Sequence, residues 1–297
     1  MLVVLCVGAG LWLQRIPDAD RAAAGLNRYV IDVAVPALVL TAIPSLEPNR
    51  ALFLAGALPW VAFAVAAGFW WAVGRGLGLE RGTVWSLVLV TGLGNTAFVG
   101  YPVVDALYGA EGLKVAVVVD QAGSFLVFAT LGVWVAQLGA GERAGALEVA
   151  RRVVSFPPFA ALLLALLLPR FPAGSELLAL LAGPLGILAA TVSPVALVAV
   201  GLRVRLRRDA LADLLVWSVL GIRMVAFPLA AWGLLAALSV EPRVLEVAVL
   251  QMGMPPMVTG GLLAVERGLD PERALRAVAL GLPLTLATVP LLRWVMG

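Results

Sequence analysis

The feature that most constrains this chain is a succession of long apolar segments separated by short polar connections. Hydrophobic residues make up 62% of the 297 positions and charged residues only 13%. Soluble domains are roughly half apolar and about a quarter charged, so a soluble fold of this size could not bury so much apolar surface. Because the segments lack the strand-like alternation of an outer-membrane barrel, we expect an all-α integral membrane protein.

Ten apolar segments can be distinguished, and we expect each to be a transmembrane helix. They cover residues 1–13, 29–45, 51–73, 83–108, 113–138, 153–168, 177–200, 211–239, 244–265 and 273–296. The first segment is short for a full span and lacks the basic region and cleavage site of a signal peptide. The central connection, residues 139–152, is also short.

Basic residues are concentrated in alternate connections, which predicts the orientation of the chain. The even-numbered connections and the C-terminus hold Arg50, Lys114, Arg170, Arg243 and Arg293. The odd-numbered connections hold Arg15, Arg21, Arg28, Arg75, Arg81, Arg143, Arg151, Arg152, Arg203, Arg205, Arg207, Arg208, Arg267, Arg273 and Arg276. Since basic loops stay in the cytoplasm, we expect a multi-pass inner-membrane protein with both termini outside.

Prolines recur at matching places in two halves of five segments each. Pro36 and Pro194 lie in the second and seventh segments, and the fourth and ninth are interrupted at Gly94–Pro102 and Gly253–Pro256. Because five is odd, the second half must enter the membrane from the opposite side. We therefore predict two inverted repeats, joined by a short cytoplasmic loop, and matched interruptions of this kind indicate a transporter site. The repeats would cover residues 1–138 and 153–297, and the loop residues 139–152.

The two interrupted segments predict an anion site near the bilayer centre. We expect the fourth segment to unwind before Pro102, with Pro102 in the first turn of a new half-helix. Where the fourth and ninth segments cross, two helix N-termini would aim free N–H groups at one point. The candidate substrate-binding residues there are Asn95, Thr96, Gly100, Tyr101, Pro102, Gln121, Gln251, Pro255 and Pro256.

Three ionisable residues of the apolar segments need a reason to be there, because a charge near the bilayer centre costs at least about 2.5–3.5 kcal/mol. Asp105 follows Pro102 by three residues, and Asp120 lies among valines of the fifth segment. Both are candidates for proton coupling, or for structural bonds to the backbone or to Arg223. Arg223, in the eighth segment, either steers an anion or fixes its helix to a neighbour.

Several function classes are disfavoured by what the sequence lacks. It contains no histidine and a single cysteine, Cys6, so we expect no imidazole metal site, no disulfide framework and no cofactor. We find no G-x-S-x-G, H-E-x-x-H or P-loop motif, which argues against a membrane-embedded enzyme. The arginines follow topology, so we expect lipid and no nucleic acid as a partner.

At the fourth segment the sequence resembles the auxin efflux carrier family. Further matches follow in order along nearly the whole chain, and the fourth-helix motif is the most specific of them. The matching stretches are Gly94-Asn95-Thr96, Gly100-Tyr101-Pro102 and Ala106-Leu107-Tyr108-Gly109, then Val35-Pro36-Ala37-Leu38, Arg223 to Pro228, Met254-Pro255-Pro256 and Glu266-Arg267-Gly268 to Pro283.

The resemblance implies a ten-helix inverted-repeat fold like that of bile acid symporters and sodium/proton antiporters. It implies a scaffold of helices 1, 2, 6 and 7, a transport domain with helices 4 and 9 crossing at prolines, and elevator-like movement. By position, Asn95 and Pro102 match the crossover of helix 4, Pro255 or Pro256 that of helix 9, and Gln121 a polar position of helix 5.

The family's substrates are auxin in plants and carboxylates such as malate or malonate in bacteria. Here the first helix is short and the long central loop of many plant members is missing, which favours a bacterial carboxylate carrier, expected as a homodimer. A sodium-coupled symporter of organic anions is the alternative. The acidic pair of strongly sodium-coupled relatives is not evident in this sequence.

Overall fold

A computed structural model describes residues 2–141, 150–151, 153–203 and 213–296. Within these residues the chain is helical, and the only β-pairing is one isolated antiparallel bridge between Gly94 and Pro256. The expected all-α class is confirmed for the described residues. The α-helices are α1 Leu2–Leu13, α2 Ala19–Tyr29, α3 Val35–Ala42, α4 Arg50–Leu77, α5 Arg81–Gly92, α6 Tyr101–Val118, α7 Val133–Ala140, α9 Pro157–Leu167, α10 Pro172–Ala190, α11 Val192–Arg203, α12 Leu214–Gly221, α13 Phe227–Ala237, α14 Pro242–Met252, α15 Val258–Glu266 and α16 Pro271–Met296.

Short π- and 3-10-helical segments join many of these helices end to end. They are η1 Val30–Ala34, η2 Ile43–Ser45, η3 Thr96–Gly100, η4 Val119–Phe125, η5 Phe128–Gly132, η6 Leu168–Arg170 and η8 Ile222–Ala226. Six continuous stretches of the described residues are long and apolar enough to cross a membrane. These are Ala19–Ser45, Arg50–Leu77, Thr96–Ala140, Pro172–Arg203, Leu214–Ala237 and Pro271–Met296.

The π-helical segments explain how prolines fit inside these helices. A proline lacks an N–H and its ring clashes with the carbonyl four residues earlier, so an α-helix normally kinks or ends there. Here η1, η3 and η8 directly precede the turns that contain Pro36, Pro102 and Pro228. The wider π-turn absorbs the misfit, and each helix continues past its proline.

One expected segment boundary is wrong. The second helical stretch begins at Ala19 and not at residue 29, because α2 is amphipathic and its polar face lowers the local hydropathy. The fourth and fifth segments are separated where expected, since the helix from Thr96 turns back at Gly109 before the chain continues to Ala140. Gly109 has a φ of 60°, a conformation that glycine adopts without strain.

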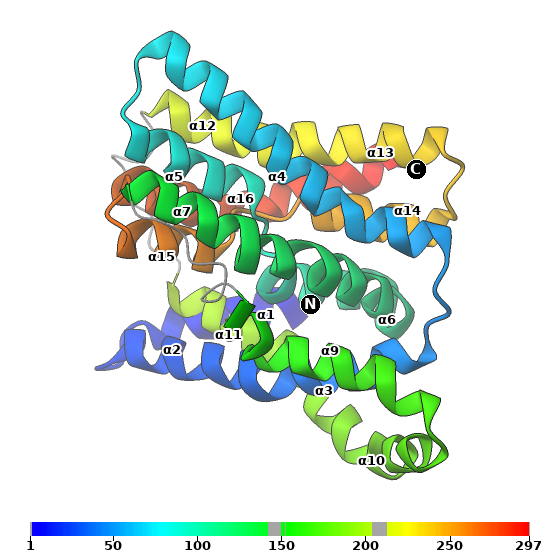
Figure 1. Cartoon of the computed structure of the whole chain (residues 1–297). Coiled ribbons are helices and arrows are strands. Elements are labelled where there is room, and N and C mark those ends of the chain that lie inside the picture. Colours follow the sequence, from blue (N-terminus) through cyan, green and yellow to red (C-terminus); the bar gives the residue numbers. More distant parts are fainter. Residues whose placement is uncertain (1, 142–149, 152, 204–212, 297) are drawn as a thin grey trace.

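The helices form two groups that lie side by side in Figure 1. One group, at the bottom of the view, contains α1, α2, α3, α9, α10 and α11, with α3 packed against α9 and α10 and α1 packed against α11. The other contains α4, α5, α12, α13, α14, α15 and α16. The hairpin from α6 to α7 lies between the two groups in this view and contacts α4, α5, α11 and α14.

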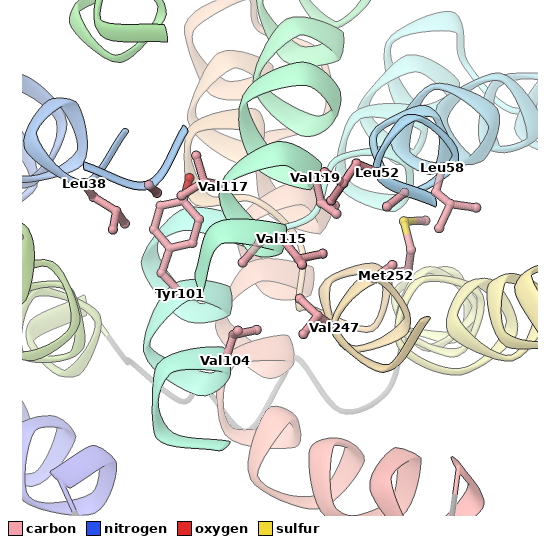
Figure 2. Packing of buried hydrophobic residues seen from close by; sticks show 14 of the residues in the cluster. Leu38, Leu52, Leu58, Tyr101, Val104, Val115, Val117, Val119, Val247 and Met252 are labelled. Atoms are coloured by element: carbon pink, nitrogen blue, oxygen red, sulfur yellow. The ribbon is translucent and has the colours of Figure 1, made fainter. Parts of the chain in front are cut away.

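A buried apolar cluster holds α6 in place. Figure 2 shows Tyr101 and Val104 of α6 next to Val115 and Val117, with Leu38 of α3 on one side. Leu52 and Leu58 of α4 and Met252 of α14 belong to the same cluster. Because lipid tails are as apolar as these side chains, close van der Waals packing holds the cluster together, and it fixes the base on which the interrupted helices rest.

The packing of α1 on α11 generates a first prediction. A Cβ at Gly10 would overlap Val198 O and lie 2.7 Å from Gly201 Cα, whereas a Cβ at Gly8 on the same helix meets nothing within 4 Å. We expect Gly10→Ala to destabilise the fold by about 1–3 kcal/mol, as overpacking does. Thermal unfolding in detergent would show a Tm several degrees lower for Gly10→Ala and an unchanged Tm for the control Gly8→Ala.

Candidate functional site

Two interrupted helices cross in the middle of the structure and pair through their backbones. Helix α5 ends at Gly92 and the chain becomes helical again at Thr96, while α14 ends at Met252 and α15 begins at Val258. The linking segments run antiparallel, with the Asn95 N–H donating to Pro255 O at 2.8 Å and the Met257 N–H to Leu93 O at 2.9 Å. This pairing satisfies main-chain groups that lipid could not.

The crossing brings together two helix C-termini, and Arg223 of η8 binds them both. Its Nε donates to Met254 O at 3.1 Å, Nη2 to Gln251 O at 3.4 Å and Nη1 to Gly92 O at 3.5 Å. The side chain is only 1% exposed. Because helix C-termini carry partial negative charge, the guanidinium both bonds their free carbonyls and neutralises them.

Gly94 is required for this arrangement, because a Cβ there would overlap Nη2 of Arg223. Of the two roles considered for Arg223, the hydrogen bonds describe the structural one: the residue locks α12–α13 to both interrupted helices. The hydrogen bonds described for its guanidinium all end on main-chain carbonyls.

The two helix N-termini at the crossing, unlike the two C-termini, keep donors without partners. Asn95 caps the first, its Oδ1 accepting from the Phe98 N–H at 3.3 Å, but its Nδ2 is buried without a hydrogen-bond partner. No side chain caps the second, at Met257. An uncapped helix start carries free N–H donors and partial positive charge. The side of the crossing that holds the two N-termini therefore contains N–H donors that are not bonded.

A cavity of about 80 Å³ adjoins both N-termini. Its polar wall comes from Asn95, Asp120, Gln121 and Thr259. The rest of the wall is apolar and rich in aromatic rings, formed by Ile31, Val35, Ala97, Phe98, Phe125, Phe128, Phe156, Pro158, Met257 and Val258. A cavity of this size takes a guest of a few heavy atoms, since an engineered cavity of about 150 Å³ holds benzene.

Asp120 is the one charged side chain described in the wall of this cavity, and it is 3% exposed. It accepts from Thr96 Oγ1 at 2.5 Å, from Tyr101 OH at 2.7 Å and from Gln121 Nε2 at 2.7 Å. These bonds link Asp120 to the helix that starts at the crossing. They leave Gln121 Oε1 buried and unpaired.

Asp105 lies elsewhere, at the contact between the two groups of helices. Its Oδ2 accepts from the Ser193 hydroxyl at 2.8 Å, which joins α6 to α11 just before Pro194. This bond matches neither structural partner expected for Asp105, since it goes to a side chain and not to the backbone or to Arg223. The two aspartates are thus in different places, and only Asp120 faces the cavity at the crossing.

One structural expectation for the site is wrong. Pro102 does not start a half-helix: the helix starts at Thr96, and Pro102 lies inside it, because η3 absorbs the proline. Gly100 faces the side chain of Gln251, and a Cβ there would overlap Gln251 Oε1. Pro255 and Pro256 lie in the extended segment, where Pro255 O accepts from Asn95.

Of the nine candidate substrate-binding residues, Asn95 and Gln121 line the described cavity wall. Thr96 and Tyr101 bind Asp120 behind it, and Gln251 is fully buried. Sequence reasoning missed Thr259 and the phenylalanines of the wall. A phenylalanine in an apolar helix carries no signal that it lines a cavity, but Thr259 stands in the first turn after Pro255-Pro256 and could have been found there.

Comparison with known proteins finds similar sequences along nearly the whole chain. A family described as Membrane transport protein matches residues 1–293. A protein of Methanothermobacter thermautotrophicus described as an uncharacterized transporter is 30% identical over 281 residues, covering 92% of this chain and 88% of its own length. An uncharacterized transporter of Methanocaldococcus jannaschii is 26% identical over 282 residues, covering 91% and 89%.

The bonds of Arg223 generate a second prediction. Arg223→Gln removes the charge and most of the donors. The buried carbonyls of Gly92 and Met254 lose the bond that Arg223 gives them, each at a cost of about 1–3 kcal/mol, whereas Gln251 O still accepts from the Met254 N–H. We expect a Tm in detergent at least several degrees below that of the wild type. Arg243→Gln, at an exposed position of α14, is the matched control and should leave the Tm unchanged. Equal Tm values for both variants would contradict the locking role.

Proposed function

Because this chain belongs to the family of membrane transport proteins that includes the auxin efflux carriers, we propose that it is a secondary transporter of small organic anions. The observation that carries the proposal is the cavity at the crossing, where the buried Asn95 amide and the start of α15 offer donors without acceptors. A carboxylate supplies acceptors, and its carbon skeleton fits between the phenylalanines. The cavity is smaller than such an acid, so we expect it to widen when substrate binds, and its small size favours malonate or malate over the bulkier auxin.

Our proposal extends to the architecture: ten spans as two inverted repeats, residues 1–138 and 153–297, joined by the short cytoplasmic loop 139–152. Segments 1, 2, 6 and 7 form a scaffold, which corresponds to the lower group of helices in Figure 1. Segments 3–5 and 8–10 form a transport domain that moves like an elevator. The loop lies largely outside the described residues. The lock of Arg223 across α5, α14 and η8 supports movement of the crossing as one body.

An elevator also needs contacts between its two bodies that can break. The bond from Ser193 to Asp105 is of this kind, because it joins α11 of the scaffold to α6. We place the protein in the inner membrane with both termini outside, on the arginine bias of the connections, and as a homodimer.

Coupling to protons follows from the position of Asp120 in the cavity. An ionised Asp120 and a bound anion about 5 Å apart would repel each other by roughly 3 kcal/mol at an effective dielectric constant near 20. Proton binding to Asp120 removes this repulsion, so the anion and a proton bind together. We therefore assign proton coupling to Asp120 and leave Asp105 as a contact between the two bodies.

Sodium coupling is the alternative, and one observation favours it. Gln121 Oε1 and Ser124 Oγ are buried oxygens without partners on the same π-helical segment as Asp120. Sodium binds through several oxygen ligands, and these groups with Asp120 and Thr96 offer some of them. Malonate uptake that requires a sodium gradient at constant pH would decide for this alternative.

A third prediction tests the site. Asn95→Ala removes the unpaired amide donor and the helix cap, and we expect it to abolish malonate uptake into proteoliposomes. The protein should still elute as a folded species, because a lost cap costs about 1 kcal/mol. Asn49→Ala removes the cap of α4, away from the crossing, and should retain uptake. Wild-type uptake by Asn95→Ala would remove the crossing from the mechanism.

A fourth prediction separates the two aspartates. Wild-type uptake should rise as the pH falls on the side from which substrate enters, because protonation of Asp120 relieves the repulsion. Asp120→Asn is permanently neutral, so its uptake should persist without this pH dependence and without response to a pH gradient. Asp105→Asn should keep both. All three proteins are measured in the same buffers, so protonation of the substrate itself affects them equally. If the uptake of Asp120→Asn depends on pH as that of the wild type does, Asp120 is not the proton carrier.

A further inference from the structure

A second and larger cavity, of about 440 Å³, adjoins the cavity at the crossing. Four residues line both of them, namely Ile31, Phe98, Val258 and Thr259. We call the larger cavity the vestibule, and its wall is formed by α2 with η1, by the end of α11 and by the start of α15. The shared wall means that a guest in the vestibule reaches the crossing by passing Phe98 and Thr259.

The vestibule lies in the half of the molecule that adjoins the arginine-rich connections. Its residues on α11 extend to Arg203, the last described residue of that helix, and α15 runs from the vestibule wall to the connection at 267–270. In Figure 1 the α4–α5 and α15–α16 connections and the start of α2 lie together at the left. If basic loops stay in the cytoplasm, the vestibule faces the cytoplasm.

Two arginines line the vestibule, and their charges are balanced differently. Arg28 forms an ion pair with Asp32, with 3.1 Å between Nε and Oδ2. Arg203 bonds a neutral group: with the amide of Asn27 in the orientation that satisfies both side chains, the Asn27 oxygen accepts from Nη2 at 2.8 Å and from Nη1 at 2.9 Å. Asp20 also interacts with Arg203 electrostatically.

This difference makes Arg203 a suitable group for capturing an anion. Asn27 bonds one edge of the guanidinium and fixes its orientation without adding a negative charge, and Asp20 acts on Arg203 through its charge. Arginine presents five N–H donors in a rigid plane, so donors remain for a carboxylate in the cavity. A fixed cation at the mouth of a low-dielectric cavity raises the local concentration of anions.

We infer that Arg203, oriented by Asn27, is an entry site that binds the carboxylate group of the substrate in the vestibule before it passes Phe98 to the crossing. This inference rests on the proposed function and adds to it a residue outside the interrupted helices. It assigns Arg203 to one side only, because the vestibule opens on the arginine-rich side. The same residue should therefore affect binding from that side and not from the other.

The test is a measurement of KM from each side of the membrane with malonate as the probe. Intact cells and inverted membrane vesicles present the two faces. The double variant Cys6→Ser, Arg28→Cys carries a single thiol, at an exposed position in the vestibule. Labelling of this thiol by an impermeant maleimide shows which of the two preparations exposes the vestibule. In that preparation, Arg203→Gln should raise KM about tenfold and leave kcat within twofold, the scale of one charge-assisted hydrogen bond.

Two controls isolate the role of the free charge. Arg28→Gln removes a paired arginine from the same wall and should change KM by less than twofold from either side. Arg203→Lys keeps the charge and should restore most of the affinity that Arg203→Gln loses. In the wild type, higher ionic strength should raise KM from the vestibule side only, and this measurement serves even where Arg203→Gln does not fold.

The outcomes separate this inference from the function on which it rests. If the wild type carries malonate but Arg203→Gln leaves KM unchanged, or raises it equally from both sides, the proposed entry site is wrong. The proposed transport function is not affected by that result. A wild-type KM from the vestibule side that does not respond to salt also overturns it. If the wild type carries neither malonate nor any other carboxylate, the proposed function fails, and the entry site with it.

Discussion

The structure depends on one interaction, the antiparallel pairing of two short extended segments within the membrane. Hydrocarbon satisfies no backbone groups, so helices can be interrupted there only where other protein groups take over. The bonds from Asn95 to Pro255 and from Met257 to Leu93 do this for the segments themselves. The four helix ends at the crossing differ in partial charge. Arg223 bonds the two negative C-termini, and the cavity adjoins the two positive N-termini.

This division explains why Arg223 matters to a site that it does not touch. With the carbonyl ends bound and their partial charge neutralised, the negative ends of α5 and α14 no longer oppose an anion at the nearby N-termini. Gly94 completes the arrangement by leaving room for the guanidinium. An arginine, a glycine and two extended segments together stabilise a costly break in two helices and leave the positive helix ends facing the cavity where we propose that the anion binds.

The helical class, the family and the positions of both interruptions could be predicted from the sequence, because hydropathy, glycine and proline all act locally. The exact role of Pro102 could not, since a proline is compatible with a break or with a π-turn, and tertiary contacts decide between them. Here Arg223 and the pairing with Pro255 place the break at Leu93 to Asn95. The start of the second helical stretch could not be predicted from mean hydropathy, because α2 buries only its alanine face and its charged residues are exposed.

The candidate site was predicted in part, and the misses have a common cause. Asn95 and Gln121 were found because a polar residue in an apolar segment needs a reason to be there. The phenylalanines of the wall were missed because apolar residues are everywhere in such a chain. Arg203 was counted among the arginines that set topology, and only the cavity distinguishes it from Arg205 or Arg207, which lie outside the described residues.

The absence of Arg223 from the proposed binding contacts also suits a carrier, which must release what it binds. A helix N-terminus contributes about 0.3–1 kcal/mol to binding an anion, and up to about 2 kcal/mol where it is partly buried. With one charge-assisted hydrogen bond of about 1.5–3 kcal/mol from Asn95, two helix ends give a sum of about 2–7 kcal/mol, which corresponds to Kd values from tens of millimolar to about ten micromolar. A full cation 4 Å from the guest would add about 4 kcal/mol at an effective dielectric constant near 20, roughly a thousandfold in affinity. That gain would slow release of the anion, so in the mechanism that we propose the buried arginine shapes the site and the helix ends bind the guest.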